Sequence, residues 1–141
     1  MAKTSTTKPR ERNHVTIYAT AGESRPGFAV LLEAEGGALV AFRGQAKSSK
    51  AAPYRAVLLG LEEAFLRGYK AVTVRSDSRL LIPNGKPIAK SEMGPAVARL
   101  AEEVGEFSHC FQRFGLERIP AADNPALGLL SSAGRRERQS A

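Results

Sequence analysis

Short segments rich in apolar residues follow one another near the start of the chain. Residues 14–18 are rich in β-branched side chains, which is typical of a strand, and residues 27–33 and 38–44 are predicted as the second and third strands. A segment with glycine, serine and proline lies over residues 19–26, and Gly36-Gly37 forms a predicted hairpin turn. Strands joined by short turns pair antiparallel, so the pattern predicts an antiparallel three-stranded unit.

The periodicity then changes to that of a helix. Pro53 opens this helix, because proline at the first helical position loses no hydrogen bond, and Gly68 ends it. Residues 71–75 follow as a fourth strand. A strand that follows a helical crossover is expected to run parallel to a neighbour. The apolar positions with helical spacing are Val57, Leu58, Leu61, Ala64 and Phe65.

The rest of the chain continues with helices and one more strand. Ser76-Asp77-Ser78 caps a predicted helical turn that Pro83 ends, and Gly94-Pro95 opens the next helix. A fifth strand lies within residues 109–119, and Asn124-Pro125 starts a last helix that reaches about Ser132. The order β-β-β-α-β-α-α-β-α predicts an α/β fold, with helices packed on a mixed five-stranded sheet.

The composition is that of a single folded domain. The chain has 141 residues, of which 43% are hydrophobic and 25% charged, and it has no apolar run long enough to span a membrane. One cysteine, Cys110, excludes an internal disulfide, and we expect it in the core on the fifth strand. His14 and His109 are too few for a histidine-rich metal site. We therefore expect a reduced compartment, most simply the cytoplasm.

The net charge of +7 is concentrated at the two ends of the chain. Residues 1–13 carry +3 and residues 135–141 carry +2, whereas residues 14–134 carry only +2. Neither end has apolar periodicity, so we expect flexible basic tails around one domain. Such tails either keep the protein in solution or contact phosphates.

Four runs of residues carry a resemblance to a known family. They are YATAGESRPG at 18–27, SKAAPYRA at 49–56, SDSRLLI at 76–82 and PAADNPALGLL at 120–130. In their order and separation they resemble the ribonuclease H superfamily, type 1 branch, over residues 14–134. The fold of that family, a mixed five-stranded sheet flanked by helices, agrees with the elements predicted above.

The resemblance implies hydrolysis of RNA paired with DNA at two Mg²⁺ ions held by four carboxylates. Position by position, those carboxylates would stand at Ala19, Pro53, Asp77 and Gly128, and only Asp77 is an acid. One carboxylate cannot hold two divalent ions, so we expect no metal cofactor and an inactive homologue of ribonuclease H. Mg²⁺ would be required only if the protein were active.

Two other acids are candidates to replace the missing ligands. Glu23, in the loop after the first strand, and Asp123, just before the last helix, could join Asp77 as a weak metal site. Without such partners, Asp77 is better explained as the cap of the helical turn that follows it.

Cations lie close to the positions that have lost their acids. With fewer carboxylates to repel phosphate, these cations predict metal-independent, electrostatic binding of nucleic acid, either an RNA/DNA hybrid or RNA. The opposing interpretation is an ordinary solvated surface. The candidate binding residues are Arg25, Lys47, Lys50, Arg55 and Arg79.

Three functions are therefore open from the sequence. The first is an inactive ribonuclease H-like protein that binds nucleic acid with help from its tails. The second is a protein-interaction or self-assembly module on the same fold, such as a homodimer. The third is an active, metal-dependent ribonuclease H with shifted acidic ligands.

Overall fold

The structure, a computed structural model, describes residues 13–21, 27–34, 37–78 and 94–129. Its first three elements are the strands β1 (His14–Ala21), β2 (Gly27–Ala34) and β3 (Gly37–Gln45). β2 pairs antiparallel with both β1 and β3, as the short connections predicted.

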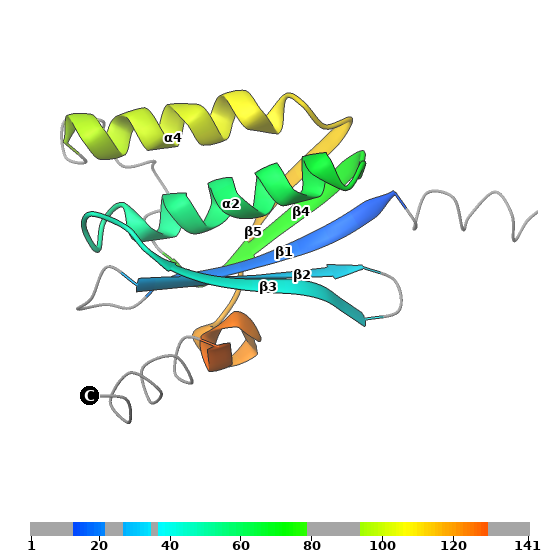
Figure 1. The fold of residues 1–141 in the computed structure, drawn as a ribbon, viewed down its shortest axis with the longest axis horizontal. Helices are drawn as coiled ribbons and strands as arrows, with labels where there is room; N and C mark the ends of the chain where they lie inside the picture. The colour runs from blue at the N-terminus through cyan, green and yellow to red at the C-terminus, as the bar shows by residue number, and fades with distance from the viewer. Residues whose placement is uncertain (1–12, 22–26, 35–36, 79–93, 130–141) are drawn as a thin grey trace, which may run out of the picture.

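The second half adds two helices and two parallel strands. Helix α2 (Ala52–Leu66) leads into β4 (Ala71–Ser76), and helix α4 (Pro95–Ser108) leads into β5 (Arg113–Arg118). β4 pairs parallel with β1, and β5 pairs parallel with β4. The sheet order β3-β2-β1-β4-β5 confirms the predicted mixed five-stranded sheet (Figure 1).

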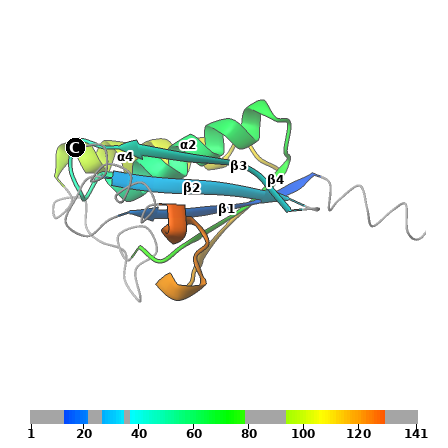
Figure 2. The same cartoon turned by 60° about the horizontal axis from the view of Figure 1, so that its bottom comes forward.

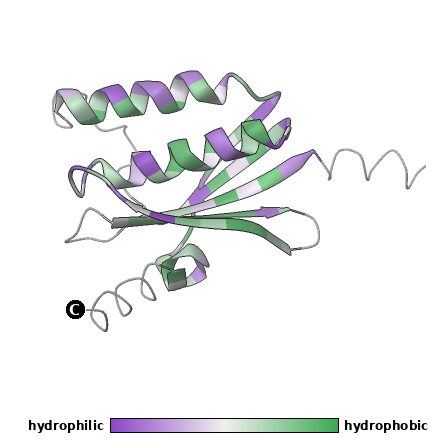
Figure 3. Ribbon diagram, viewed as in Figure 1, coloured by the Kyte–Doolittle hydropathy of each residue, from purple (hydrophilic) through white to green (hydrophobic). Residues whose placement is uncertain are grey.

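Both helices lie on one face of the sheet (Figure 1). The buried side chains of β1 on this face are Val15, Ile17 and Ala19. A Cβ placed on Gly60 of α2 would lie 2.6 Å from Ile17 Cγ2, so α2 packs against β1 at this glycine. Figure 3 shows both helices with hydrophilic and hydrophobic residues side by side, as expected for helices with only one buried side.

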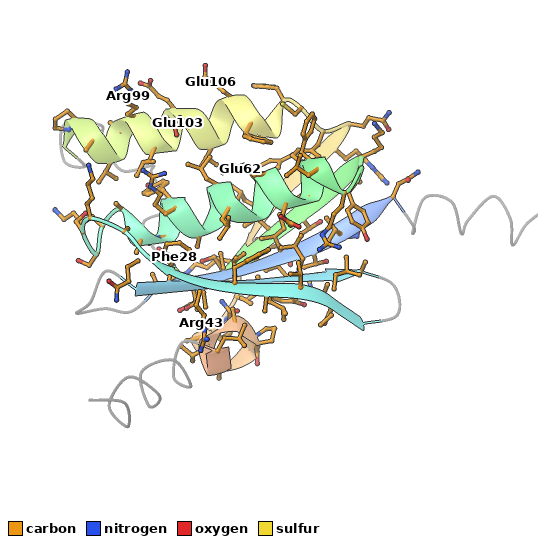
Figure 4. The ribbon with its side chains drawn as sticks, in the orientation of Figure 1. Phe28, Arg43, Glu62, Arg99, Glu103 and Glu106 are labelled. Carbon is orange, nitrogen blue, oxygen red and sulfur yellow. The ribbon has the colours of Figure 1, made fainter. Side chains whose placement is uncertain are left out.

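The opposite face of the sheet is more polar. The last part of the described chain crosses below it as the 3₁₀ turn η1 (Ala121–Asp123), followed by a helical turn over 126–129 (Figures 1 and 2). Figure 4 shows Arg43 projecting from β3 on this side, while Arg99 and Glu106 project from α4 away from the sheet.

Three expectations about elements change. Cys110 is exposed in the turn after α4, because the helix continues to Ser108 and β5 begins only at Arg113; the expectation of a core strand residue was wrong. His109 is likewise exposed in that turn. The last helix starts two residues later than predicted, at Ala126, and its expected end near residue 132 lies outside the described residues, as does the predicted turn ended at residue 83.

Candidate nucleic-acid interface

The candidate site lies where β1 and β4 end and α2 begins. Because β4 is parallel to β1, their C-terminal ends meet at the same edge of the sheet, and Ala19 pairs with Ser76 there. Helix α2 starts at the same end of the molecule (Figure 1). Its first turn contains Pro53, which confirms the helix start that this proline predicted. The Pro53 side chain is buried. Open α/β sheets bind ligands at the carboxyl ends of such strands.

Asp77, the one acid among the four family positions, is held by an amide. Asn124 Nδ2 donates to Asp77 Oδ1 at 2.8 Å and to the carbonyl oxygen of Ala19 at 3.0 Å. The amide oxygen of Asn124 accepts from the backbone N–H of Ala126 at 3.0 Å. Asn124 is only 4% exposed. One buried side chain therefore ties together the ends of β1 and β4 and the start of the last helical turn.

The helical turn that Asp77 was expected to cap lies outside the described residues. Ser76 Oγ accepts from the backbone N–H of Ser78 at 3.1 Å, whereas the contact described for the Asp77 carboxylate is to Asn124. Serine thus stabilises the chain after β4 locally, and Asp77 serves a long-range contact between segments 47 residues apart.

If the register of β1 and β4 is continued by one residue, Thr20, and not Ala19, comes next to Asp77. Ala19 alternates with Ile17, which faces α2, so the Ala19 side chain also points to the helix-covered face. The parallel register pairs Ala19 with Ser76, so the next position on both strands joins Thr20 and Asp77. Thr20 is 1% exposed, and its hydroxyl is buried without a hydrogen-bond partner.

The other candidate ligands do not gather around Asp77. Gly128 is exposed, with no atom within 4 Å of the place where a Cβ would stand, and Asp123 is exposed in η1. Within the described ranges, no group of three or more histidine, cysteine, aspartate or glutamate residues could hold a metal ion. Glu23, Arg25 and Arg79 lie outside those ranges.

Exposed cations surround the start of α2. Lys47, Lys50 and Arg55 are all exposed, and the first turn of the helix contains no acidic residue. The helix has no side-chain cap at its N-terminal residue Ala51, although the N–H of Ala51 donates to Ser48 Oγ at 3.2 Å. The partial positive charge of a helix N-terminus adds to these cations.

Comparison with known proteins identifies the family of the chain. A family model described as reverse transcriptase-like matches residues 13–131, which is most of the chain. The chain belongs to the reverse transcriptase-like family. No curated protein matched the sequence.

Solved structures similar to this family member are ribonucleases H. The ribonuclease H1 of Halobacterium salinarum has 18% identity and a TM-score of 0.63, with 83% of this chain and 92% of that one covered. The N-terminal RNase H domain of rv2228c from Mycobacterium tuberculosis has 21% identity and a TM-score of 0.62, with 83% and 95% covered. LC11-RNase H1, solved in complex with an RNA/DNA hybrid, has 20% identity and a TM-score of 0.63, with 79% and 88% covered. The ribonuclease H-like fold expected from the sequence is confirmed.

The sequence pattern of this reverse transcriptase-like chain did not reveal the role of Asn124. The pattern predicts only that it starts a helix, whereas the structure makes it the residue that links three segments. The signal available in the sequence was its place in the PAADNPALGLL frame. An Asn just before a helical turn also satisfies a free backbone N–H, which explains its contact with Ala126.

A second set of polar contacts lies on the face of the sheet opposite α2 and α4, called the open face below. Arg75 donates to Glu117 Oε1 at 3.0 Å and to the Tyr18 hydroxyl at 3.2 Å, and the bond to Tyr18 raises the Arg75 pKa. His14 Nε2 lies 2.9 Å from Thr73 Oγ1. Burial, with Arg113 and Arg75 nearby, lowers the His14 pKa.

No helix in the described part of the chain has both the length and the apolar composition needed to cross a membrane.

Proposed function

We propose that this protein is a non-hydrolytic member of the ribonuclease H-like fold that binds nucleic acid without a metal ion. Its ligand class is an RNA/DNA hybrid or RNA, contacted through exposed cations at the start of α2 and, from the sequence, through the basic ends of the chain. The observation that carries the proposal is the Asp77–Asn124 hydrogen bond, in which an amide N–H satisfies the one remaining family-position carboxylate.

The missing ligands support the absence of hydrolysis. A pair of Mg²⁺ ions about 3.5–4 Å apart is held mainly by carboxylate oxygens. Of the four family positions, Ala19, Pro53 and Gly128 offer no side-chain oxygen. The residue that follows Ala19 is Thr20, which has only a neutral hydroxyl. These residues do not fit two divalent ions, so we expect no hydrolysis that depends on such a pair.

The charges support binding of phosphates in place of metal ions. Lys47, Lys50 and Arg55 are exposed and have no acidic neighbour in the first helical turn. Binding through such contacts weakens as salt rises, because each neutralised phosphate releases a counterion. We therefore expect an affinity that depends strongly on salt and discriminates weakly between RNA and DNA.

Fluorescence anisotropy with a labelled RNA/DNA hybrid in EDTA tests this function. We expect binding at low salt that weakens as the salt concentration rises. The double variant Lys47→Gln/Lys50→Gln should reduce the slope of log affinity against log salt by about two. Lys70→Gln, just beyond the far end of α2, is the matched control and should keep the wild-type slope.

Two results would overturn the proposal. One is the absence of hybrid and RNA binding at low salt. The other is cleavage of the hybrid with Mg²⁺ or Mn²⁺ that the Asp77→Asn variant abolishes, since this would restore an active enzyme.

One observation favours a protein-interaction module as the second candidate. At the end of α2, Phe65 is 52% exposed and Leu66 is 77% exposed. The Phe65 ring lies 5.9 Å from that of Phe107 and 6.4 Å from that of Phe111. A dimer in sedimentation that Leu66→Ser dissociates, together with no nucleic-acid binding, would favour this function.

A further inference from the structure

Arg118 is a cation whose partner is missing from the described part of the chain. It is the last residue of β5 and pairs in register with Ser76, so its side chain lies on the helix-covered face. Its Nη1 is buried and has no hydrogen-bond partner. By contrast, Arg75 is bound to Glu117 and Tyr18, and Arg67 to Glu63.

A buried guanidinium nitrogen without a partner is costly. Burial removes its water, and no acceptor replaces that water, so the folded protein loses stability until an acceptor binds. The nearest acids along the strands do not serve this purpose. Glu117 pairs with Arg75 and Asp77 with Asn124, and both lie on the opposite face by strand alternation.

The position of the unpaired atom points to a ligand. Among the described residues, two buried side-chain polar atoms lack a hydrogen-bond partner, Thr20 Oγ1 and Arg118 Nη1. Both residues lie at the C-terminal ends of strands, but on opposite faces of the sheet, so Arg118 is considered by itself. Orphaned polar groups in a folded protein call for an explanation, and this edge of an α/β sheet is where ligands bind.

We propose that Arg118 is a phosphate-binding residue, which forms an anion subsite at the end of β5 for a backbone phosphate of the nucleic acid. The inference rests on the proposed function and adds a residue outside the four family positions and outside the cations at the start of α2. A guanidinium suits this ligand because its planar N–H groups match two phosphate oxygens. The side chain as a whole is partly exposed, so a phosphate can approach it from the solvent.

The test compares Arg118→Met with Arg113→Met. Both arginines belong to β5, but Arg113 is exposed at the other end of the strand and on the other face. We expect Arg118→Met to weaken hybrid binding about tenfold at low salt, which corresponds to the loss of one charged hydrogen bond. The slope of log affinity against log salt should fall by about 0.9. Arg113→Met should stay within about twofold of the wild type, and Arg118→Lys should recover part of the affinity.

A second measurement separates this subsite from the proposed function. Thermal unfolding is followed in inorganic phosphate and in chloride at the same ionic strength. We expect phosphate to raise the wild-type Tm more than that of Arg118→Met, which keeps the cations at the start of α2 and the general stabilising effect of phosphate. In chloride, Arg118→Met should be at least as stable as the wild type, because the variant removes a buried nitrogen that has no hydrogen-bond partner.

The outcomes are distinct. If the wild type binds no hybrid but phosphate raises its Tm through Arg118, the nucleic-acid function fails and the anion subsite stands, with a free phosphate group as its ligand. If the hybrid binds and Arg118→Met has the wild-type affinity and salt slope, the subsite is wrong and the proposed function stands. A Tm response to phosphate that is equal in both proteins also overturns the subsite.

Discussion

On the face of the sheet that α2 covers, Val15, Ile17 and Val74 have no exposed surface, whereas Tyr18, Thr73 and Arg75 on the opposite face remain partly exposed. The same alternating strands build both faces. The covered face is held by close packing, since Gly60 is needed where α2 approaches Ile17. The open face is held by directed polar contacts, such as those of Asn124.

The difference separates the side chains that hold the fold together from those at the candidate site. The core depends on apolar side chains of the covered face, which include Ala19. Asp77 lies at the edge of the sheet, where the amide of Asn124 donates to its carboxylate.

The largest expected effect comes from placing an acid on each face in turn. Ala19→Asp buries a carboxylate against α2 and should destabilise the protein by at least about 4 kcal/mol in urea unfolding. Thr20→Asp places the new carboxylate on the opposite face, towards Asp77, and should lower the free energy of unfolding by less. With Pro53→Glu and Gly128→Asp added, the Thr20→Asp variant should gain stability from Mg²⁺, whereas the corresponding Ala19→Asp triple should not. Equal losses from the two single changes would contradict the assignment of faces.

The next largest effect concerns the anchor of the open face. Asn124→Ala removes the donor to Asp77 and to the Ala19 carbonyl, and leaves the N–H of Ala126 without its acceptor. We expect a loss of about 2 kcal/mol in the free energy of unfolding, because buried polar groups lose their partners. Exposed Asp123→Ala, in the neighbouring turn, is the control and should change stability by less than about 0.5 kcal/mol. A loss as small as that of the control would mean that Asn124 is not an anchor.

A smaller effect tests the packing of the covered face. Gly60→Ala should destabilise the protein by about 1–2 kcal/mol, because its Cβ would meet Ile17 Cγ2 at 2.6 Å and Val30 Cγ2 at 3.2 Å. Gly105→Ala in α4, where nothing lies within 4 Å, should stabilise it by about 0.5–1 kcal/mol. Chemical denaturation measures the sign of the change in the free energy of unfolding. If Gly60→Ala stabilised the protein as Gly105→Ala does, α2 would not be in close contact with β1.

The smallest effect is the pH dependence contributed by His14. Its pKa in the folded protein lies below the usual 6.5, so the unfolded chain takes up the proton first as pH falls. The stability that neutral His14 contributes is complete above pH 6.5 and is lost as pH falls through that value towards the lowered pKa. His14→Gln should remove this pH dependence, so that the free energy of unfolding measured in urea falls less as the pH is lowered below 6.5.

The sequence alone indicated the strands and helices and the mixed character of the sheet, but not that β4 pairs with β1 and β5 with β4. The short connections between β1, β2 and β3, the proline at the start of α2 and the apolar spacing within it are local signals. The residues at the four positions that the resemblance assigns to metal ligands could also be read directly, since they depend only on the sequence. The prediction for the turn after α4 was wrong because neither His109 nor Cys110 breaks a helical or an extended pattern by itself.

Only the tertiary structure decided which side chains meet at the edge of the sheet. The Asn124 amide reaches the Ala19 carbonyl across 105 residues and the Asp77 carboxylate across 47 residues, and no local periodicity encodes such a contact. The register of β1 against β4 pairs Ala19 with Ser76, and only its continuation by one residue brings Thr20 next to Asp77. The unpaired nitrogen of Arg118 became visible in the same way, because hydrogen-bond partners are a property of the folded chain and not of residue order.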